Sequence, residues 1–254
     1  MTYLKYKKFK NNNSLLSGIC IILLFVTLLL LLLGVVGFRF NFISAGYALL
    51  TLTKYAIYIS FATNFISLVS LGYSLNLERK FFPLLVSVFC FCFSSLIIMQ
   101  SYGHLMNLKS SPYINDLNTN YDEIINFKVS KHSIPDINSY IIQEYGGFNR
   151  PYTNLKSLYV KDKSFEEVYL LSYSIIESMD MKISYENLEE GIIEAVDKSF
   201  WYGFKDDFII RIEMLISGNI RLDIRSASRV GRSDFGENYK RIRTFIEVFN
   251  NKNI

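Results

Sequence analysis

Cysteine is scarce in this sequence, and its distribution is uneven. The 254 residues contain three cysteines, Cys20, Cys90 and Cys92, and all three lie in apolar stretches near the N-terminus. Residues 104–254 contain none. A cysteine-free domain suits an oxidising compartment, where a free thiol is a liability. Cys90 and Cys92 form a C-x-C pair rather than the C-x-x-C of redox sites, so we interpret them as small packing residues of a membrane helix.

Histidine and recognisable catalytic motifs are also scarce. The only histidines are His104 and His132. The sequence has no H-E-x-x-H, no G-x-S-x-G, no phosphate-binding loop and no dinucleotide fingerprint, which are the short patterns that carry metal, nucleophile and nucleotide chemistry. We therefore expect no cofactor and no metal ion, and the sequence identifies no catalytic residue.

Acidic residues are nearly absent from the first part of the chain. Residues 1–103 hold eight Lys and Arg against one acid, a net charge of +7. Residues 104–254 hold nineteen Lys and Arg against twenty-two acids, a net charge of −3. A domain that binds nucleic acid usually carries a net positive charge. We therefore expect no nucleic-acid partner.

Three long apolar stretches occupy the N-terminal part, at about residues 15–36, 42–71 and 81–99. Each is close to or above the roughly 20 residues needed to cross a bilayer, and a backbone in lipid must satisfy its own hydrogen bonds, which favours helices. The first stretch is long for a signal peptide, and no small-residue cleavage site follows it. We expect residues 1–103 to form three transmembrane helices, with the lipid bilayer as a partner.

Basic residues flank these stretches on one side. They are Lys5, Lys7, Lys8 and Lys10 before the first stretch, and Arg79 and Lys80 between the second and the third. Because cytoplasmic loops are rich in Lys and Arg, we expect a cytoplasmic N-terminus and place residues 104–254 outside the cytoplasm. In a Gram-negative bacterium this means an inner-membrane protein with a periplasmic domain. Lys54 interrupts the second stretch, and we interpret it as an interfacial lysine rather than a functional intramembrane ion.

Residues 104–155 are predicted to form an extended arm. They are rich in Asn, Asp, Ser and Thr and show no sustained period. Prolines and glycines punctuate them at Pro112, Pro135, Gly146, Gly147 and Pro151, as is typical of loops. Because Ile114 and Leu117 can provide apolar anchors, we expect the arm to wrap around the following domain.

Residues 156–254 show the periods of helices and strands. Ser164 is a good N-cap for a helix that ends near residues 178–180, with two glutamates in its first turn. Period-two patterns typical of β-strands then occur around 181–185, 208–216 and 220–224. A further strand is predicted at 192–196, with Ile192, Glu194 and Val196 on one side and Ile193 and Ala195 on the other. A last helix is predicted from about Asp234, whose spacing from Glu237 resembles a capping box. Its apolar stripe consists of Phe235, Tyr239, Ile242, Ile246 and Phe249.

The expected fold class is α+β. Three N-terminal transmembrane helices precede a two-layer sandwich, in which two helices cover one face of a four-stranded antiparallel sheet. A three-residue loop at 217–219 would pair even-numbered positions with even-numbered ones, so that the apolar faces of the last two strands agree. Glu213 is then expected to lie diagonal to Arg221 and Arg225, on a face that also holds Arg211 and Asp223, within reach of ion pairing.

The densest polar segment is RSASRVGRSDFGEN, residues 225–238, where the last strand leads into the last helix. Two interpretations are open. In the first, its side chains form a structural network with the loop, the arm and the acids Asp206, Asp207 and Asp234. In the second, its arginines and the amides at the helix start bind an anion such as a lipid phosphate. The candidate residues for a ligand or anion are Arg225, Ser226, Ser228, Arg229, Arg232, Ser233 and Asn238.

Asp206 and Asp207 are adjacent carboxylates that follow an aromatic cluster. Such a pair can bind a metal or act as acid and base, but no third ligand follows at a recognisable spacing. Ion pairing with nearby arginines is the preferred interpretation. The aromatic cluster is interpreted as core and rim, although an exposed Trp201 would indicate contact with lipid or a partner. Its members are Phe200, Trp201, Tyr202 and Phe204.

Two segments, YGFKDD at 202–207 and RSASRVGRSDFGENYKRI at 225–242, resemble the bacterial family called domain of unknown function 1499. Residues 112–120, PYINDLNTN, are similar to that family's opening pattern P-x-I-[HN]-D-[IV]-[ST]-T-D. They depart from it at Asn118, in place of Ser or Thr, and at Asn120, in place of the final Asp. The resemblance covers about residues 110–250 and implies membership of the family but no activity.

Function is therefore expected to lie in binding. The leading hypothesis is a non-enzymatic inner-membrane protein whose periplasmic domain binds a lipid or an envelope protein. The alternatives are an envelope hydrolase that uses Asp206, Asp207 and Arg225 or Arg229, a lipid-phosphate-binding protein that uses the Arg/Ser/Asp cluster, and a scaffold assembled through the membrane helices. Burial and mutual pairing of these side chains would favour architecture, whereas an open pocket lined by them would favour a ligand or an enzyme.

Overall fold

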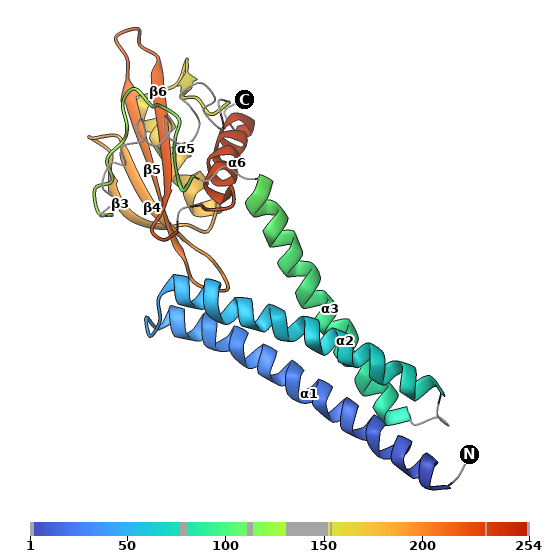
Figure 1. The fold of residues 1–254 in the computed structure, drawn as a ribbon. Coiled ribbons are helices and arrows are strands. Elements are labelled where there is room, and N and C mark those ends of the chain that lie inside the picture. Colours follow the sequence, from blue (N-terminus) through green and yellow to red (C-terminus); the bar gives the residue numbers. More distant parts are fainter. Residues whose placement is uncertain are drawn as a thin grey trace. The chain divides into compact units, whose positions relative to one another are not determined.

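The computed structural model describes residues 3–76, 81–110, 114–130, 152, 154–231 and 233–252. The chain divides into two compact units, Met1–Lys109 and Ser110–Ile254. The first contains the long apolar helices, and the second contains the described β-strands (Figure 1).

Three long helices make up the first unit, and each contains a segment long and apolar enough to cross a membrane. The helices are α1 (Tyr3–Arg39), α2 (Lys54–Asn76), which the π-helix η1 (Tyr47–Thr53) precedes directly, and α3 (Phe81–Ser110). The candidate spans are Leu15–Arg39, Tyr47–Leu75 and Phe81–Met106. The three predicted apolar helices are thus confirmed as helices. α3 is longer than predicted, so residues 104–110 continue this helix instead of starting the extended arm.

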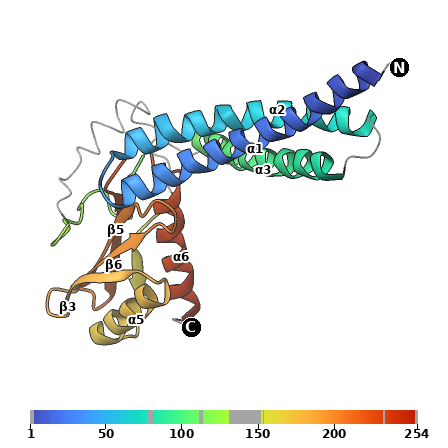
Figure 2. The ribbon, with the colours of Figure 1, turned by 90° about the horizontal axis from the view of Figure 1, so that it is seen from below.

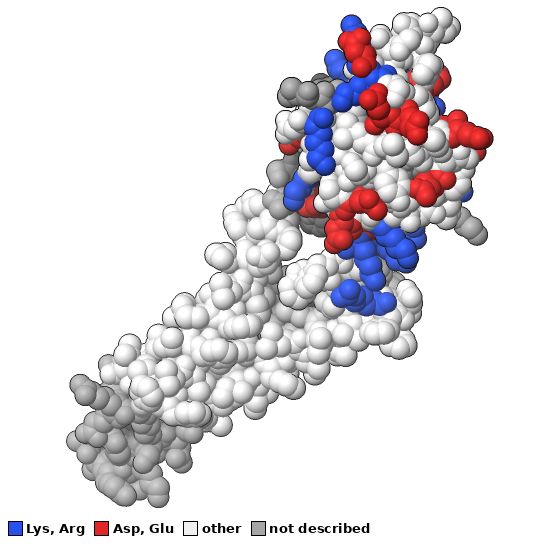
Figure 3. Space-filling model, turned by 180° about the vertical axis from the view of Figure 1, so that it is seen from behind, with Lys and Arg blue, Asp and Glu red and all other residues white. Residues whose placement is uncertain are grey.

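Small polar side chains join α2 to α3. Asn64 Nδ2 donates to Ser95 Oγ at 2.7 Å and to Ser94 Oγ at 3.2 Å, and Ser87 Oγ donates to Ser70 Oγ at 2.8 Å. Most large apolar side chains of these helices are exposed instead, and the described surface of the unit carries few charges (Figure 3). Interhelical polar bonds inside and apolar side chains outside are what a lipid environment favours.

The second unit is built on an antiparallel sheet with the main order β1-β6-β5-β4-β3, and β2 pairs with β6 as well. The strands are β1 (Asp116–Asn118), β2 (Leu158–Val160), β3 (Lys182–Asn187), β4 (Ile192–Lys198), β5 (Lys205–Met214) and β6 (Ile220–Ser228). The four strands predicted from alternation are confirmed as β3 to β6. The predicted total of four is wrong, because the sheet has six strands. β1 and β2 have three residues each, too few for a readable alternation, and pairing with β6 defines them.

Two helices, α5 (Phe165–Ser178) and α6 (Glu237–Lys252), cover one face of the sheet (Figures 1 and 2). The side chains between these layers form one buried apolar cluster. Its members include Phe208, Ile210, Leu222 and Ile224 of the sheet, Val168 and Ile175 of α5, and Ile242, Phe245 and Phe249 of α6. The predicted α+β class with two helices on one face is therefore confirmed.

Local signals place the start of α5 as predicted. The Ser164 hydroxyl accepts from the Glu167 N–H at 3.2 Å, and the Ser164 N–H donates to the Glu167 carboxylate at 2.7 Å. This reciprocal capping box satisfies two backbone donors at the helix start.

The start of α6 differs from the prediction, because the helix begins at Glu237 and Asp234 forms the turn before it. The Asp234 carboxylate accepts from the Gly236 N–H at 2.9 Å and from the Asn238 N–H at 2.7 Å. Phe235 precedes the helix with a positive φ of 59° and is exposed, so it does not belong to the buried stripe.

The register of β5 and β6 has the predicted parity but a longer loop. Even-numbered residues face even-numbered ones, as Met214 faces Ile220. The loop spans 215–219 and is longer than the three residues predicted. The two additional loop residues keep the apolar side chains of both strands on the same face of the sheet, but they shift the register by two residues. Glu213 therefore lies directly opposite Arg221 rather than diagonal to it.

Candidate functional site

The sheet face opposite the helices is rich in charge, and residues 119–130 of the arm cover part of it. Ile125 packs against Ile192 of β4 and Ile209 of β5. Four side chains of acidic or basic residues are almost fully buried on this face; they are Glu194, Asp207 and Arg225, each 0% exposed, and Asp223, 1% exposed. A buried charge costs several kcal/mol unless it is paired, so the contacts of these groups decide whether they are available to a ligand.

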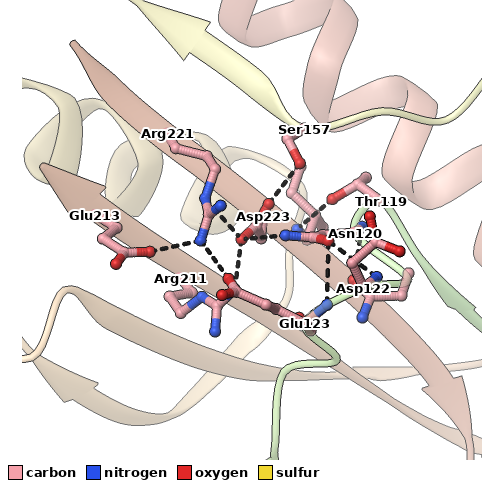
Figure 4. A network of polar contacts seen from close by, with 11 residues as sticks. Thr119, Asn120, Asp122, Glu123, Ser157, Arg211, Glu213, Arg221 and Asp223 are labelled. Carbon is pink, nitrogen blue, oxygen red and sulfur yellow. Dashed lines mark hydrogen bonds and ion pairs between the residues drawn. The ribbon is translucent and has the colours of Figure 1, made fainter. Parts of the chain in front are cut away.

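Asp223 is the centre of the first set of contacts (Figure 4). Its carboxylate accepts from Arg211 Nη2 at 2.6 Å, from Ser157 Oγ at 2.5 Å and from Asn120 Nδ2 at 3.3 Å. Arg221 Nε lies 3.3 Å from the same carboxylate. Asp223 thus ties β5 and β6 to the arm through Asn120 and to the segment before β2 through Ser157.

Arg221 extends this network to the surface. Its Nη2 donates to Glu123 of the arm at 2.5 Å and to Glu213 of β5 at 2.7 Å. Burial disfavours the charged guanidinium, but the hydrogen bond to Glu123 and the nearby carboxylates of Asp223 and Glu213 outweigh this effect and raise the pKa of Arg221. The arginine therefore stays charged and holds the arm by ion pairing.

The arm encloses the guanidinium of Arg225. Nε and Nη2 donate to the two oxygens of Asp116 at 3.0 and 2.7 Å, and Nη1 donates to the Ile125 carbonyl at 2.6 Å. The guanidinium also lies 4.7 Å from the ring centroid of Phe127, a cation–π geometry. Arg225 therefore presents no exposed donor to an external anion.

Asp207 and Arg229 form a second bidentate pair at the end of the sheet. Arg229 Nε and Nη2 each donate to Asp207 at 2.7 Å, and Ser130 Oγ donates to the same carboxylate at 2.7 Å. The hydrogen bond with Asp207 raises the pKa of Arg229. Close by, the Glu194 carboxylate accepts three backbone N–H groups of residues 128–130 at 2.6 to 3.1 Å. These contacts tie the far end of the described arm to β4 and β5.

Asn238 organises the helix-covered face at the same end of the sheet. Its Oδ1 accepts from Ser226 Oγ at 2.7 Å and from Arg241 at 2.6 Å. Its Nδ2 donates to the Asn115 carbonyl at 2.9 Å and to Ser228 Oγ at 3.1 Å. All four hydrogen-bonding positions of this amide are therefore used to join α6, β6 and the arm.

Arg241 of α6 neutralises two carboxylates on neighbouring strands. Asp197 of β4 and Asp206 of β5 face each other directly, an arrangement that repels. Arg241 Nη2 donates to Asp197 at 2.6 Å and to Asp206 at 2.8 Å. Burial opposes the charge of Arg241, but these acids outweigh it and raise its pKa.

The structure separates some residues that the sequence placed together. Asp206 and Asp207 are consecutive in a strand, so their side chains point to opposite faces of the sheet, where they bind Arg241 and Arg229 respectively. They do not form one carboxylate pair. Ser233 Oγ accepts from the Phe235 N–H at 3.3 Å in the turn before α6. The candidate Arg232 lies outside the described residues.

Sequence reasoning missed two of the main participants. Arg241 is not part of the apolar stripe predicted for the last helix, but its side chain is almost buried. Asp116 was not connected with Arg225, which is 109 residues away in the chain. A signal did exist for Asp116, because it lies in the family-like segment at 112–120.

A groove opens beside the Asp223 network, between the arm and β2. Its volume is about 630 Å³, within the range of small-molecule sites. Three tyrosines contribute aromatic surface, and charged and hydroxyl side chains contribute polar contacts. The lining includes Tyr121, Tyr152, Tyr159, Glu123, Lys156 and Arg221.

Comparison with known proteins identifies the second unit. A protein-family profile described as "Protein of unknown function (DUF1499)" matches residues 112–249. This chain belongs to that family. No curated protein matches the DUF1499 chain.

The residues that carry the family resemblance bind one another in the DUF1499 domain. Asp116 of the opening segment pairs with Arg225 of the C-terminal segment, and Asp207 pairs with Arg229. Asn120, which replaces the aspartate of the family pattern, donates to Asp223, a bond that an ionised aspartate cannot make. Within the part of the chain that the structure describes, no three His, Cys, Asp or Glu side chains are grouped so that they could hold a metal ion.

Proposed function

We propose that this protein is a non-enzymatic, membrane-anchored binding protein of the bacterial envelope, whose DUF1499 domain holds a ligand in the groove beside β2. One observation carries the proposal. The buried charged groups of the network are already bound to one another, whereas the adjacent groove is open and lined by Tyr121, Tyr152 and Tyr159. The network therefore holds the arm in position, and the groove beside it is the proposed ligand site.

The chemistry of the groove favours an amphipathic ligand. Tyrosine rings offer apolar faces with a polar edge, and Lys156 can bind a polar head group. A lipid of the envelope satisfies both requirements. The hydrolase alternative has less support, because Asp206 and Asp207 point to opposite faces and each is engaged by an arginine.

The proposed location follows from the charge distribution. Lys and Arg concentrate before the first candidate span and between the second and third spans, which favours a cytoplasmic N-terminus. The DUF1499 domain would then lie on the other side of the inner membrane, in the periplasm. The absence of cysteine from residues 104–254 agrees with this oxidising compartment.

Native mass spectrometry of the full chain, extracted in mild detergent, tests the proposed ligand site. We expect the wild-type protein to retain small-molecule adducts, and the double variant Tyr159→Ala, Lys156→Ala to lose them. Leu170→Ala is the matched control, because Leu170 is exposed on α5, on the other face of the sheet. Adducts of equal abundance in all three proteins, or none in the wild type, would refute a site in this groove.

A further inference from the structure

The loop between β4 and β5 exposes two large aromatic side chains. Phe200 is 79% exposed and Trp201 is 71% exposed, and their rings pack edge to face with centroids 5.3 Å apart. The exposed residues lie at the end of a hairpin whose two strands are paired up to Lys198 and Lys205. An exposed aromatic pair on a protruding turn is a common feature of surfaces that contact a membrane or a partner.

The loop is braced, so the exposure of these rings is built into its structure. The Ser199 N–H donates to the Phe204 carbonyl at 2.9 Å, and the Phe204 N–H donates to Ser199 Oγ at 2.9 Å. The rings of Tyr202 and Phe204 stack, with centroids 5.4 Å apart. Between them, Gly203 has a φ of 73°, which residues with a side chain rarely adopt. These contacts brace the loop that exposes Phe200 and Trp201.

Two lysines stand opposite each other at the base of this loop. Lys198 and Lys205 are register partners, so their side chains leave the same face of the sheet, and both are exposed. Like charges in this arrangement are destabilising unless an anion lies between or near them. Aromatic rings with adjacent lysines are the composition typical of the interface between bilayer core and head groups.

The chain connection from α3 enters the domain at the same end of the sheet. The Ser228 N–H donates to the Asn115 carbonyl, and the Arg229 N–H donates to the Lys205 carbonyl. The entry point is therefore about two strand spacings, roughly 10 Å, from the base of the aromatic loop. The opposite hairpin, at residues 215–219, lies the length of β5 away, about 33 Å for its ten residues.

The length of the connection limits how far this end can lie from the membrane. The third candidate span ends at Met106, and α3 ends at Ser110. Met106 to Ser110 is four helical steps, and the five further residue steps to Asn115 can reach no more than about 18 Å, so Asn115 lies at most about 24 Å from Met106. We propose that the loop carrying Phe200 and Trp201 inserts into the head-group region of the bilayer that the chain's own helices span, with Lys198 and Lys205 at anionic lipid phosphates. This contact orients the DUF1499 domain on the membrane, independently of any ligand in the groove.

Trp201 is the single tryptophan of the chain, so its fluorescence reports on this loop alone. The full chain is reconstituted into phosphatidylcholine vesicles that contain phosphatidylglycerol, and quenching by brominated lipid is compared with quenching by aqueous iodide. We expect brominated lipid to remove most of the emission and iodide to have little effect. Quenching by iodide without quenching by brominated lipid overturns the proposal. Protection from both quenchers also overturns it, because it would place the loop against protein.

Two variants test the chemistry of the contact. Replacing both lysines, Lys198→Glu with Lys205→Glu, is expected to weaken quenching by brominated lipid and to strengthen quenching by iodide. Ile216→Ser is the matched control, since Ile216 is the fully exposed apolar residue of the opposite hairpin, and its quenching should equal that of the wild type. An unchanged profile in the double lysine variant would overturn the role given to the lysines.

Discussion

Arg225 belongs to the segment that resembles the family, and its contacts show what this segment does in the structure. It is fully buried, and its partners Asp116 and Ile125 belong to the arm. A buried ion pair contributes little net stability compared with an apolar core, but removal of one partner leaves an uncompensated charge. Arg225 therefore fixes where the arm lies on the sheet, and the arm in turn shapes one wall of the groove.

Substitution of Arg225 by methionine is expected to destabilise the domain strongly. The change keeps an apolar stem but leaves the Asp116 carboxylate and the Ile125 carbonyl without this donor. The expected loss in the free energy of unfolding is about 3–5 kcal/mol. Urea unfolding of the full chain in detergent, followed by near-ultraviolet circular dichroism, measures it.

The control for this prediction is Arg243→Met. Arg243 pairs with Glu247 at 2.6 Å on the exposed surface of α6, where ion pairs contribute little to stability. Equal losses for the two variants would show that burial of Arg225 has no special role.

Residue-scale prediction from sequence succeeded where partners were close in the chain and failed where they were distant. Alternation placed Arg211, Glu213 and Arg221 on one face, and Glu213 indeed binds Arg221. The pairing of Asp116 with Arg225 spans 109 residues, and no local period encodes such a contact. It arises only after the arm has folded back onto β6.

At the scale of elements, β1 is the most informative part of the fold. Its three residues pair with the end of β6, and Leu117 enters the apolar core with 1% exposure. Helices and long strands can be predicted from the spacing of their apolar residues and, for helices, from their capping residues, such as Ser164 and Glu167 of α5. A three-residue strand has no such code, and for this reason β1 and β2 could not be predicted.

Leu117→Ala is expected to loosen β1 from the edge of β6. The lost core contacts correspond to about 2–5 kcal/mol, and the paired amides of β1 and β6 should exchange with solvent faster. Hydrogen–deuterium exchange of the full chain measures this effect. Tyr159→Ala in β2 is the control, because this side chain is exposed. Unchanged protection at residues 116–118 in Leu117→Ala would contradict the role of Leu117 as an anchor.

The capping box of α5 predicts a pH dependence. Hydrogen bonds from the Ser164 backbone and hydroxyl lower the pKa of Glu167 from its ordinary value of 4.5. An acid with a lowered folded-state pKa contributes stability that is present above its unfolded pKa and is lost as pH falls through the folded one. The stability difference between the wild type and Glu167→Gln should therefore shrink as the pH is lowered from the unfolded-state pKa of Glu167 through its folded-state pKa.

Urea unfolding at a series of pH values checks this prediction. Glu166→Gln removes a neighbouring charge from the same helical turn and serves as the control. A stability difference for Glu167→Gln that does not vary with pH would contradict the ionised capping box.

The whole molecule combines two units of opposite character. The first consists of apolar helices with few charges, and the second carries interspersed acids and bases (Figure 3). Composition alone was sufficient to predict this division, because length and hydropathy decide which helices can cross a bilayer. The groove could not be predicted, because its walls come from three separate segments: the arm, the chain that leads into β2 together with Tyr159 of that strand, and β6.

The side of the membrane on which the DUF1499 domain lies is the most direct test of the account. Replacing Cys20, Cys90 and Cys92 with serine leaves a chain without thiols, into which Lys182→Cys introduces one on the exposed face of β3. Asn12→Cys, in α1 just before the candidate span Leu15–Arg39, is the matched control. In cells with a permeabilised outer membrane and an intact inner membrane, a membrane-impermeant maleimide should label position 182 and leave position 12 unlabelled. Labelling of position 12 without labelling of position 182 would contradict an envelope function for the domain.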